Sequence, residues 1–194
     1  MDSRFLEIFN SLEVPIQCRE EWLAFLEYCA SYFEHRGIIH PIILEIGTRL
    51  NQQKPFYESL LGAEHIGIDL TAAEGVPDIL GDSTALETTE KVKAHLAGRS
   101  IDLLFIDGDH SYNGVKHDYE IYAPMTRHII AFHDINLRWE GAGIKKFWDE
   151  LRAGEGREYS FISIDSWTES EIRLGYATRI GIGLAVRKNA NEIR

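Results

Sequence analysis

The sequence predicts an α/β domain built on an open, mostly parallel β-sheet. Short apolar runs alternate with segments long enough to form crossover helices, which is the βαβ rhythm of such a sheet. Each run is rich in Ile, Leu and Phe, as expected for strands buried on both faces. Polar or acidic residues stand at the carboxyl end of each run, where open α/β sheets bind their ligands.

The elements follow in chain order. An added N-terminal helix is predicted over 19–35, because apolar side chains recur at spacings of three and four before Gly37 ends it. Strands are predicted at 42–47, 65–70, 101–107 and 128–134, with helices at 51–62, 84–98 and 112–125 between and around them. The carboxyl third adds a helix over 143–152 and strands near 159–164 and 180–187, which suit an antiparallel edge.

Length and composition favour one compact domain over residues 1–194. The chain is 44% hydrophobic and has no low-complexity tract, so it can bury a substantial core. We divide it into an N-terminal helical segment (1–37), a cofactor-binding core (38–150) and C-terminal strands (151–194). Whether the domain forms a homo-oligomer is left open.

Net charge and hydropathy disfavour two classes of binding partner, nucleic acids and membranes. The formal net charge of −11 provides no basic stripe to neutralise phosphates, so a nucleic-acid partner is disfavoured. The first residues lack a basic region followed by an apolar run, and no segment approaches the roughly 18 apolar residues of a membrane span. We therefore expect a cytoplasmic protein without a membrane partner.

The loop after the first strand and the acid after the second indicate a nucleoside. Asp69 follows Gly47 by 22 residues, close to the spacing of about 20 expected when an acid accepts from a ribose. The loop reads E-I-G-T-R-L-N, and its single glycine does not make the turn that holds a pyrophosphate in NAD sites. Asp82 and Ser83 can line an adenine edge, and one of them can cap the helix that begins near Thr84; the two roles are compatible.

Five stretches, in order, resemble class I S-adenosylmethionine (SAM)-dependent methyltransferases, and within them the cephalosporin-hydroxylase-like and macrolide-sugar O-methyltransferase group. They are ILEIGT, GIDL, ILGDS, IDLLFIDGDHSYNGVKHDYEIYAP and IAFHDI, between about residues 38 and 150. The resemblance implies a Rossmann-like three-layer sandwich with a seven-stranded sheet, SAM at its carboxyl edge, and methyl transfer to an oxygen of a small acceptor. By position it implies cofactor contacts from the methionine end to the adenine by Glu45, Gly47, Thr48, Asp69, Leu70, Asp82, Ser83 and Asp107.

The loop after Gly47 departs from the family pattern. Relatives carry further glycines there, whereas this chain has Arg49, Leu50 and Asn51. Bulkier side chains would crowd the methionine pocket. Asn51 tolerates a left-handed backbone better than most residues, which would let the turn survive.

Methylating an alcohol requires a device that removes its proton, either a base or a divalent cation. Asp107, His133 and Asp134 end two strands and can converge on an ion, and in the resembling sugar methyltransferases metal ligands fall at these positions. Those relatives have two carboxylates where His133 and Asp134 stand here. Oxygen ligands alone favour Mg²⁺, whereas an imidazole shifts the preference toward Mn²⁺, iron or zinc. Without a cation, Asp107 would instead contact the methionine amino group.

His110, three residues after Asp107, is the candidate general base. A histidine at the matching place has that role in the same relatives, and an imidazole titrates near working pH. The alternative is a loop histidine that pairs with Asp109 or a backbone carbonyl and only holds the turn.

The acceptor side of the site is poorly specified. Trp139, Trp167 and Tyr176 lie in the loops expected around it, where they either stack on a ring or pack the loops onto the sheet. Two other functions remain open. One is a catalytically silent binding module, suggested by the missing glycines and by His133. The other is a metal-dependent hydrolase, although the chain lacks the Asp-x-His expected after a first strand.

Overall fold

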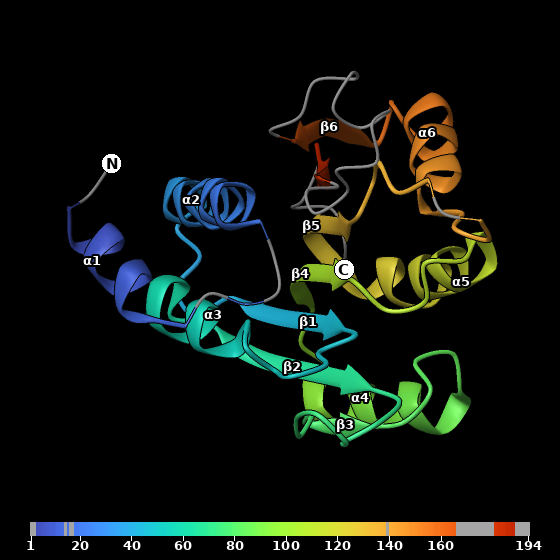
Figure 1. The fold of residues 1–194 in the computed structure, drawn as a ribbon, viewed down its shortest axis with the longest axis horizontal. Coiled ribbons are helices and arrows are strands. Elements are labelled where there is room, and N and C mark those ends of the chain that lie inside the picture. The colour runs from blue at the N-terminus through green and yellow to red at the C-terminus, as the bar shows by residue number, and fades with distance from the viewer. Residues whose placement is uncertain (1–2, 14, 16–17, 139, 166–180, 189–194) are drawn as a thin grey trace.

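The computed structural model describes residues 3–13, 15, 18–138, 140–165 and 181–188. Within these residues, seven strands form one sheet in the order β3-β2-β1-β4-β5-β7-β6 (Figure 1). The strands are β1 Ile42–Ile46, β2 Glu64–Asp69, β3 Ile79–Leu80, β4 Ile101–Ile106, β5 Thr126–His133, β6 Tyr159–Ile164 and β7 Ile182–Arg187. β7 is antiparallel to both β5 and β6, and the other pairs are parallel. The predicted mostly parallel sheet with antiparallel pairing at one edge is confirmed.

Helices cover both faces of the sheet, which gives the predicted three layers. One face carries α1 Ser3–Ser11, α2 Arg19–Arg36 and α3 Lys54–Leu61, and the other carries α4 Leu86–Leu96, α5 Tyr112–Tyr122 and α6 Ile144–Gly154 (Figure 1). A 3₁₀ turn, η1 Ala123–Met125, joins α5 to β5. Successive strand residues alternate between the two cores: Ile43 packs with the first helices and Leu44 with the second. No described helix combines the length and apolar composition needed to cross a bilayer.

The N-terminal helix α2 is an integral part of one core layer. Its buried side chains Trp22, Phe25 and Phe33 lie on the sheet, and the Trp22 ring packs edge-on against Phe105 of β4 at 5.8 Å between centroids. Gly37 ends the helix with φ 66°, the left-handed conformation that glycine adopts without a side-chain clash. The predicted helix and its stop are therefore confirmed.

Apart from α1, for which the sequence predicted no helix of its own, the remaining boundaries differ from the prediction only at element ends, except at β3. This strand has two residues, too few to produce a periodic pattern, and the sequence did not predict it. The last predicted strand began at residue 180, which lies outside the described residues together with Trp139, Trp167 and Tyr176. Those three aromatic side chains thus remain predictions.

Candidate active site

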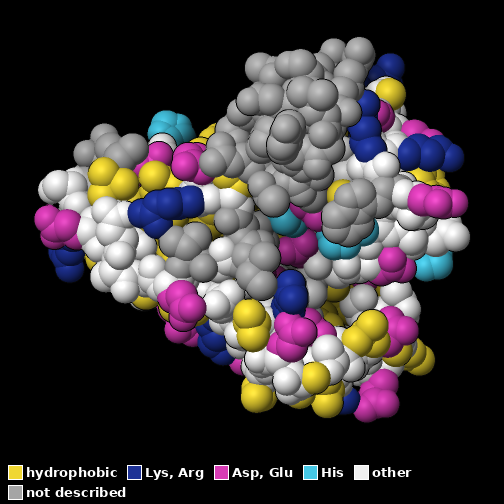
Figure 2. Space-filling view, viewed as in Figure 1, with side chains coloured by type: hydrophobic (Ala, Val, Ile, Leu, Met, Phe, Trp, Pro, Cys, Tyr) yellow, Lys and Arg dark blue, Asp and Glu magenta, His cyan; other side chains and the backbone are white. Residues whose placement is uncertain are grey.

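Four parallel strands end together at one edge of the sheet. Ile46 of β1 is in register with both Ile68 of β2 and Ile106 of β4, and Ile106 is in register with Phe132 of β5. The residues that follow these positions therefore share one edge, as the sequence predicted. Histidine and acidic side chains meet near the centre of the face shown in Figure 2.

The loop after β1 keeps a tight turn despite its single glycine. Gly47 has φ 88°, and a β carbon there would lie 2.2 Å from the carbonyl oxygen of Asp107, so no other residue fits. Arg49 and Asn51 also have positive φ, 46° and 55°. The backbone thus adopts left-handed turns where relatives use glycine, and part of the strain is offset because the Arg49 N–H donates to Asp69 Oδ2 at 2.7 Å.

A cavity of about 560 Å³ opens along this edge. The predicted cofactor residues that line it are Gly47, Asp69, Leu70, Asp82, Ser83 and Asp107. Asp69 accepts from the backbone N–H groups of Arg49 and Thr71, one on each carboxylate oxygen. Each of its oxygens therefore keeps a lone pair for a ligand hydroxyl.

Asp82 and Ser83 line the cavity and also make hydrogen bonds that hold their loop in place. Asp82 Oδ1 accepts from the backbone N–H and the hydroxyl of Thr84, at 2.8 and 2.7 Å. Ser83 Oγ donates to Asp118 Oδ1 at 2.6 Å. Asp118, on α5, also lines the cavity and had been given no role from the sequence. The only signal for it was its place within the family-like stretch from Ile101 to Pro124.

Glu45 and Thr48 were expected at the methionine end, but neither lines this cavity. Glu45 is fully buried, and its Oε2 lies 2.7 Å from Nε2 of His65. Nδ1 of His65 faces Asp78 at 3.5 Å. Burial raises the pKa of Glu45, and hydrogen bonding to His65 only partly opposes it. Contact of Glu45 and Thr48 with a cofactor stays a prediction.

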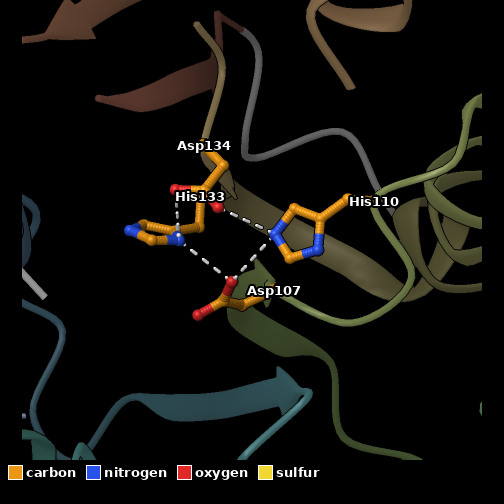
Figure 3. A group of neighbouring side chains, drawn as sticks. All are labelled: Asp107, His110, His133 and Asp134. Carbon is orange, nitrogen blue, oxygen red and sulfur yellow. Dashed lines mark hydrogen bonds and ion pairs between the residues drawn. The ribbon is translucent and has the colours of Figure 1, made fainter. Parts of the chain in front are cut away.

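The second part of the site is a compact cluster of two acids and two histidines (Figure 3). One possible ligand atom from each of Asp107, His110, His133 and Asp134 lies within 4.8 Å of the others. His133 Nδ1 is 3.0 Å from Asp107 Oδ1 and 2.9 Å from Asp134 Oδ1. His110 Nε2 is 3.0 Å from Asp134 Oδ2 and 3.5 Å from Asp107 Oδ1. The structure thus brings together all four residues that the sequence assigned to metal binding or base catalysis.

These groups hold one another in their charged forms. Burial disfavours a charged His133, but Asp107 and Asp134 outweigh it and raise its pKa to about 10. The same carboxylates raise the pKa of His110 to about 9 against a smaller effect of burial. Conversely, burial would raise the pKa of Asp107, yet His133 and His110 lower it to about 2. The expectation that His110 titrates near working pH is therefore wrong for the metal-free protein, where it is protonated at pH 7.

Comparison with known proteins supports the fold. Residues 63–135, from β2 to just beyond β5, match a family model described as a methyltransferase domain. An uncharacterised protein, y4gI, from Sinorhizobium fredii is 43% identical over 56 residues, a stretch that covers 28% of this chain and only 6% of that protein.

Two solved structures share the architecture at low identity. An O-methyltransferase from Bacillus cereus, in complex with S-adenosylhomocysteine (SAH), is 16% identical with a TM-score of 0.57, covering 97% of this chain and 92% of that one. The MycE methyltransferase of the mycinamycin pathway, in complex with Mg, SAH and mycinamycin VI, is 14% identical with a TM-score of 0.56, covering 86% and 50%. The chain therefore shares the fold of these two methyltransferases, as its sequence motifs implied, and its residues 63–135 resemble a methyltransferase domain.

Proposed function

We propose that this chain is a SAM-dependent methyltransferase that methylates an oxygen of a small hydroxylated acceptor with help from a divalent cation. The observation that carries the proposal is the position of Asp107, which both lines the cavity and belongs to the acid–histidine cluster. A cofactor in the cavity and an acceptor at the cluster would therefore be neighbours. That adjacency is what methyl transfer between two bound molecules requires.

The cavity fits a nucleoside cofactor without phosphate. Its volume lies within the range of about 300–1,000 Å³ typical of small-molecule sites. Asp69 would accept from the ribose hydroxyls, and the loop at Gly81–Ser83 would face the adenine. Asp69, Asp82 and Asp109 also line the cavity, and they would repel a phosphate. SAM bound there would supply an electrophilic methyl group on its sulfonium.

The cluster fits a divalent cation. Among the described residues, buried His110 Nε2 and Asp134 Oδ1 lack a well-aligned hydrogen bond, although each has an oppositely charged group within 3.0 Å. Asp134 also holds a left-handed backbone, φ 61°, which is uncommon for a non-glycine residue and typical of functional sites. Asp107, His133 and Asp134 would hold the ion, and this mixed donor set suits Mn²⁺ better than Mg²⁺. A bound cation would lower the pKa of an acceptor hydroxyl.

His110 is the proposed general base, and its surroundings set the conditions for that role. Only a neutral imidazole can take a proton, and Asp107 and Asp134 keep this ring charged in the metal-free protein. Neutralising those carboxylates would remove the cause of the raised pKa. The same Nε2 cannot bind an ion and accept a proton at once, so His110 as a fourth ligand is the competing role.

The proposal can be tested in two stages. Calorimetry should first show binding of SAH, and crystals soaked in Mn²⁺ should show an anomalous peak beside Asp107 and Asp134. Labelled SAM should then be offered with a library of sugars, phenols and small hydroxylated metabolites. A protein that binds neither SAH nor SAM would be the catalytically silent module. The single domain over 1–194, the cytoplasmic location, the lack of a nucleic-acid partner and a homo-oligomer stay predictions.

A further inference from the structure

A further group of titratable side chains lies at the amino edge of the sheet. His128 stands near the start of β5 and is only 5% exposed. Its Nδ1 lies 3.3 Å from the Tyr32 hydroxyl of α2, and its Nε2 lies 3.7 Å from Oδ1 of Asp102, near the start of β4. Parallel strands begin at the edge opposite to the one where they end, so this group lies across the sheet from the cavity and from the acid–histidine cluster.

An irregularity in the strand pairing turns His128 toward α2. Between two pairs that are in register, β4 has one residue, Asp102, whereas β5 has two, Arg127 and His128. Such a bulge is rare between parallel strands, and bulges often re-aim a side chain beside a functional site. Ile129 packs with the layer of α2, so regular alternation would turn His128 to the other face of the sheet. The ring contacts Tyr32 of α2 instead, which the bulge makes possible.

Two arginine side chains beside this group lack an acidic partner. The exposed Arg36 guanidinium lies over the Tyr32 ring, with Cζ 5.3 Å from the ring centroid. The half-buried Arg127 has its Nη2 3.4 Å from the Ser100 hydroxyl oxygen, a long contact with a neutral group. In the part of the chain that the structure describes, no carboxylate oxygen lies within 4.0 Å of either guanidinium. Both can therefore pair with an anion from solution.

The charges around His128 favour such an anion. Burial, followed by the positive charges of Arg127 and Arg36, lowers the pKa of His128 to about 4, so its ring is neutral at pH 7. Asp102 is the acid that faces the ring, and its Oδ2 accepts from the backbone N–H of Ile42 at 2.8 Å. Two guanidinium groups thus exceed one carboxylate here, although the formal net charge of the whole chain is −11. A neutral imidazole close to two cations can gain a proton when an anion arrives.

We propose that Arg36, Arg127 and Tyr32 bind the phosphate group of a small molecule at the amino edge of the sheet. Guanidinium groups bind phosphate oxygens through paired N–H donors. As the anion binds, His128 takes up a proton from solvent and its Nδ1–H donates to the Tyr32 oxygen, which frees the Tyr32 O–H to donate to the phosphate. The net charge of −11 disfavours a nucleic acid as the source of that phosphate. The site lies apart from the proposed cofactor and acceptor and does not depend on either.

Calorimetry at low ionic strength tests the site with two probes, inorganic phosphate and glycerol 3-phosphate. Both present the same phosphate group, so wild-type protein should bind at least one of them. Binding of both identifies the phosphate group alone as the ligand, and binding of the ester alone identifies a phosphomonoester. Wild-type protein that binds neither probe overturns the inference.

Three charge variants then locate the bound anion. Arg127→Gln should weaken binding by about 10–100-fold, since it removes a charge-assisted pair of hydrogen bonds. Arg36→Gln should weaken it by about 2–5-fold, because that side chain is exposed. Lys116→Gln is the matched control, because it removes one positive charge from α5, which covers the other face of the sheet, and it should keep the wild-type affinity. A loss in Lys116→Gln equal to that in Arg127→Gln would mean that only net charge matters and would overturn the inference.

The proton on His128 gives a second readout that a simple surface charge would not produce. Sulfate is the probe, because it remains a dianion at about pH 5.5, and calorimetry in two buffers of different ionisation enthalpy counts the protons exchanged. Wild-type protein should take up about half a proton or more per ion, since the anion raises the pKa of His128 from about 4 toward the pH of the experiment. His128→Gln should bind sulfate without this uptake. Wild-type protein that binds sulfate without taking up a proton overturns the inference even if the variant does not fold, and so does equal uptake in the two proteins.

Discussion

Two acid–histidine networks lie on neighbouring strands of this sheet. The first joins Glu45 of β1 to His65 of β2 and on to Asp78, whose other oxygen takes Lys54 at 2.7 Å. The second joins Asp107, His110, His133 and Asp134 after β4 and β5. The side chains of Glu45 and His65 are 0% exposed, whereas that of His110 is 33% exposed. We call the first network sealed for its enclosed Glu45–His65 pair, although Asp78 and Lys54 at its outer end are 28% and 29% exposed. We call the second network open because His110 reaches solvent.

Both networks pair acidic side chains with basic ones, so their composition does not distinguish them. The sealed network pairs Glu45 and Asp78 with His65 and Lys54, and the open one pairs two carboxylates with two imidazoles. Position relative to the strand end is what differs. His65 lies within β2 and is enclosed by packing, including the Tyr57 ring stacked on it at 5.4 Å. An acid–histidine pair can therefore serve as a binding site when it lies at the end of a strand, where solvent and ligands can reach it.

The largest expected effect concerns the open network. His110→Ala should lower turnover by roughly 10²–10⁴-fold, since it removes the proposed base, while SAH affinity stays nearly unchanged. Metal-free protein should also become less stable at neutral pH, because the variant lacks the charged imidazole that Asp107 and Asp134 hold. Labelled-methyl assays on an identified acceptor and thermal unfolding would measure both. Retained turnover with an unaltered acid limb of the pH profile would make His110 structural and leave proton removal to the cation or water.

The sealed network should behave in the opposite way. His65→Leu leaves Glu45 as a buried acid without its partner, which should lower the free energy of unfolding by about 3–5 kcal/mol. Urea denaturation would measure it. The double variant Glu45→Leu/His65→Leu should recover much of the loss, since apolar residues can replace a buried pair. If His65→Leu is as stable as wild type, the sealed network is not a stability element and the contrast with the open one fails.

Protons and metal should compete only in the open network. In metal-free protein, the folded state keeps protons on His110 and His133 that the unfolded chain releases above a pKa of about 6.5. The stability they contribute is therefore complete below pH 6.5 and lost as pH rises through about 9 and 10. The slope is at most about 1.4 kcal/mol per pH unit for each group.

Urea unfolding in a chelator at several pH values, compared between wild type and His133→Asn, isolates this contribution from other groups. The variant should have a smaller loss of stability between pH 6.5 and 10. Excess Mn²⁺ should stabilise wild type more at the higher pH, because fewer protons compete for the ligands. Equal slopes in the two proteins would mean that His133 is not held charged by its neighbours.

The sequence reveals much of the open network and little of the sealed one. Asp107, His133 and Asp134 follow apolar strand runs, so strand ends alone predict that they converge. His65 stands inside such a run and offers no periodic signal, and Asp78 reaches it from a loop. The raised pKa of His110 depends on two carboxylates from different strands, which spacing cannot reveal. Asp118 was missed for a related reason, since burial against a glycine is a tertiary feature.

The smallest effect is expected from replacing Asp69. It tests most sharply the idea that acids at the carboxyl ends of the strands form the binding site. Asp69 is the last residue of β2, and Asp107 directly follows the last residue of β4. The hydrogen bonds of Asp69, however, come from the backbone N–H groups of Arg49 and Thr71 and not from imidazoles. An acid satisfied in this way should bind a neutral hydroxyl and no metal. Asp69→Ala should weaken SAH binding by about 1–3 kcal/mol, because it leaves ribose hydroxyls without an acceptor, and should leave Mn²⁺ affinity unchanged. Titrating both ligands separately by calorimetry distinguishes the two effects. Unchanged SAH affinity would remove Asp69 from the ribose site, and a parallel loss of Mn²⁺ would show that the cavity and the cluster cannot be treated as separate binding sites.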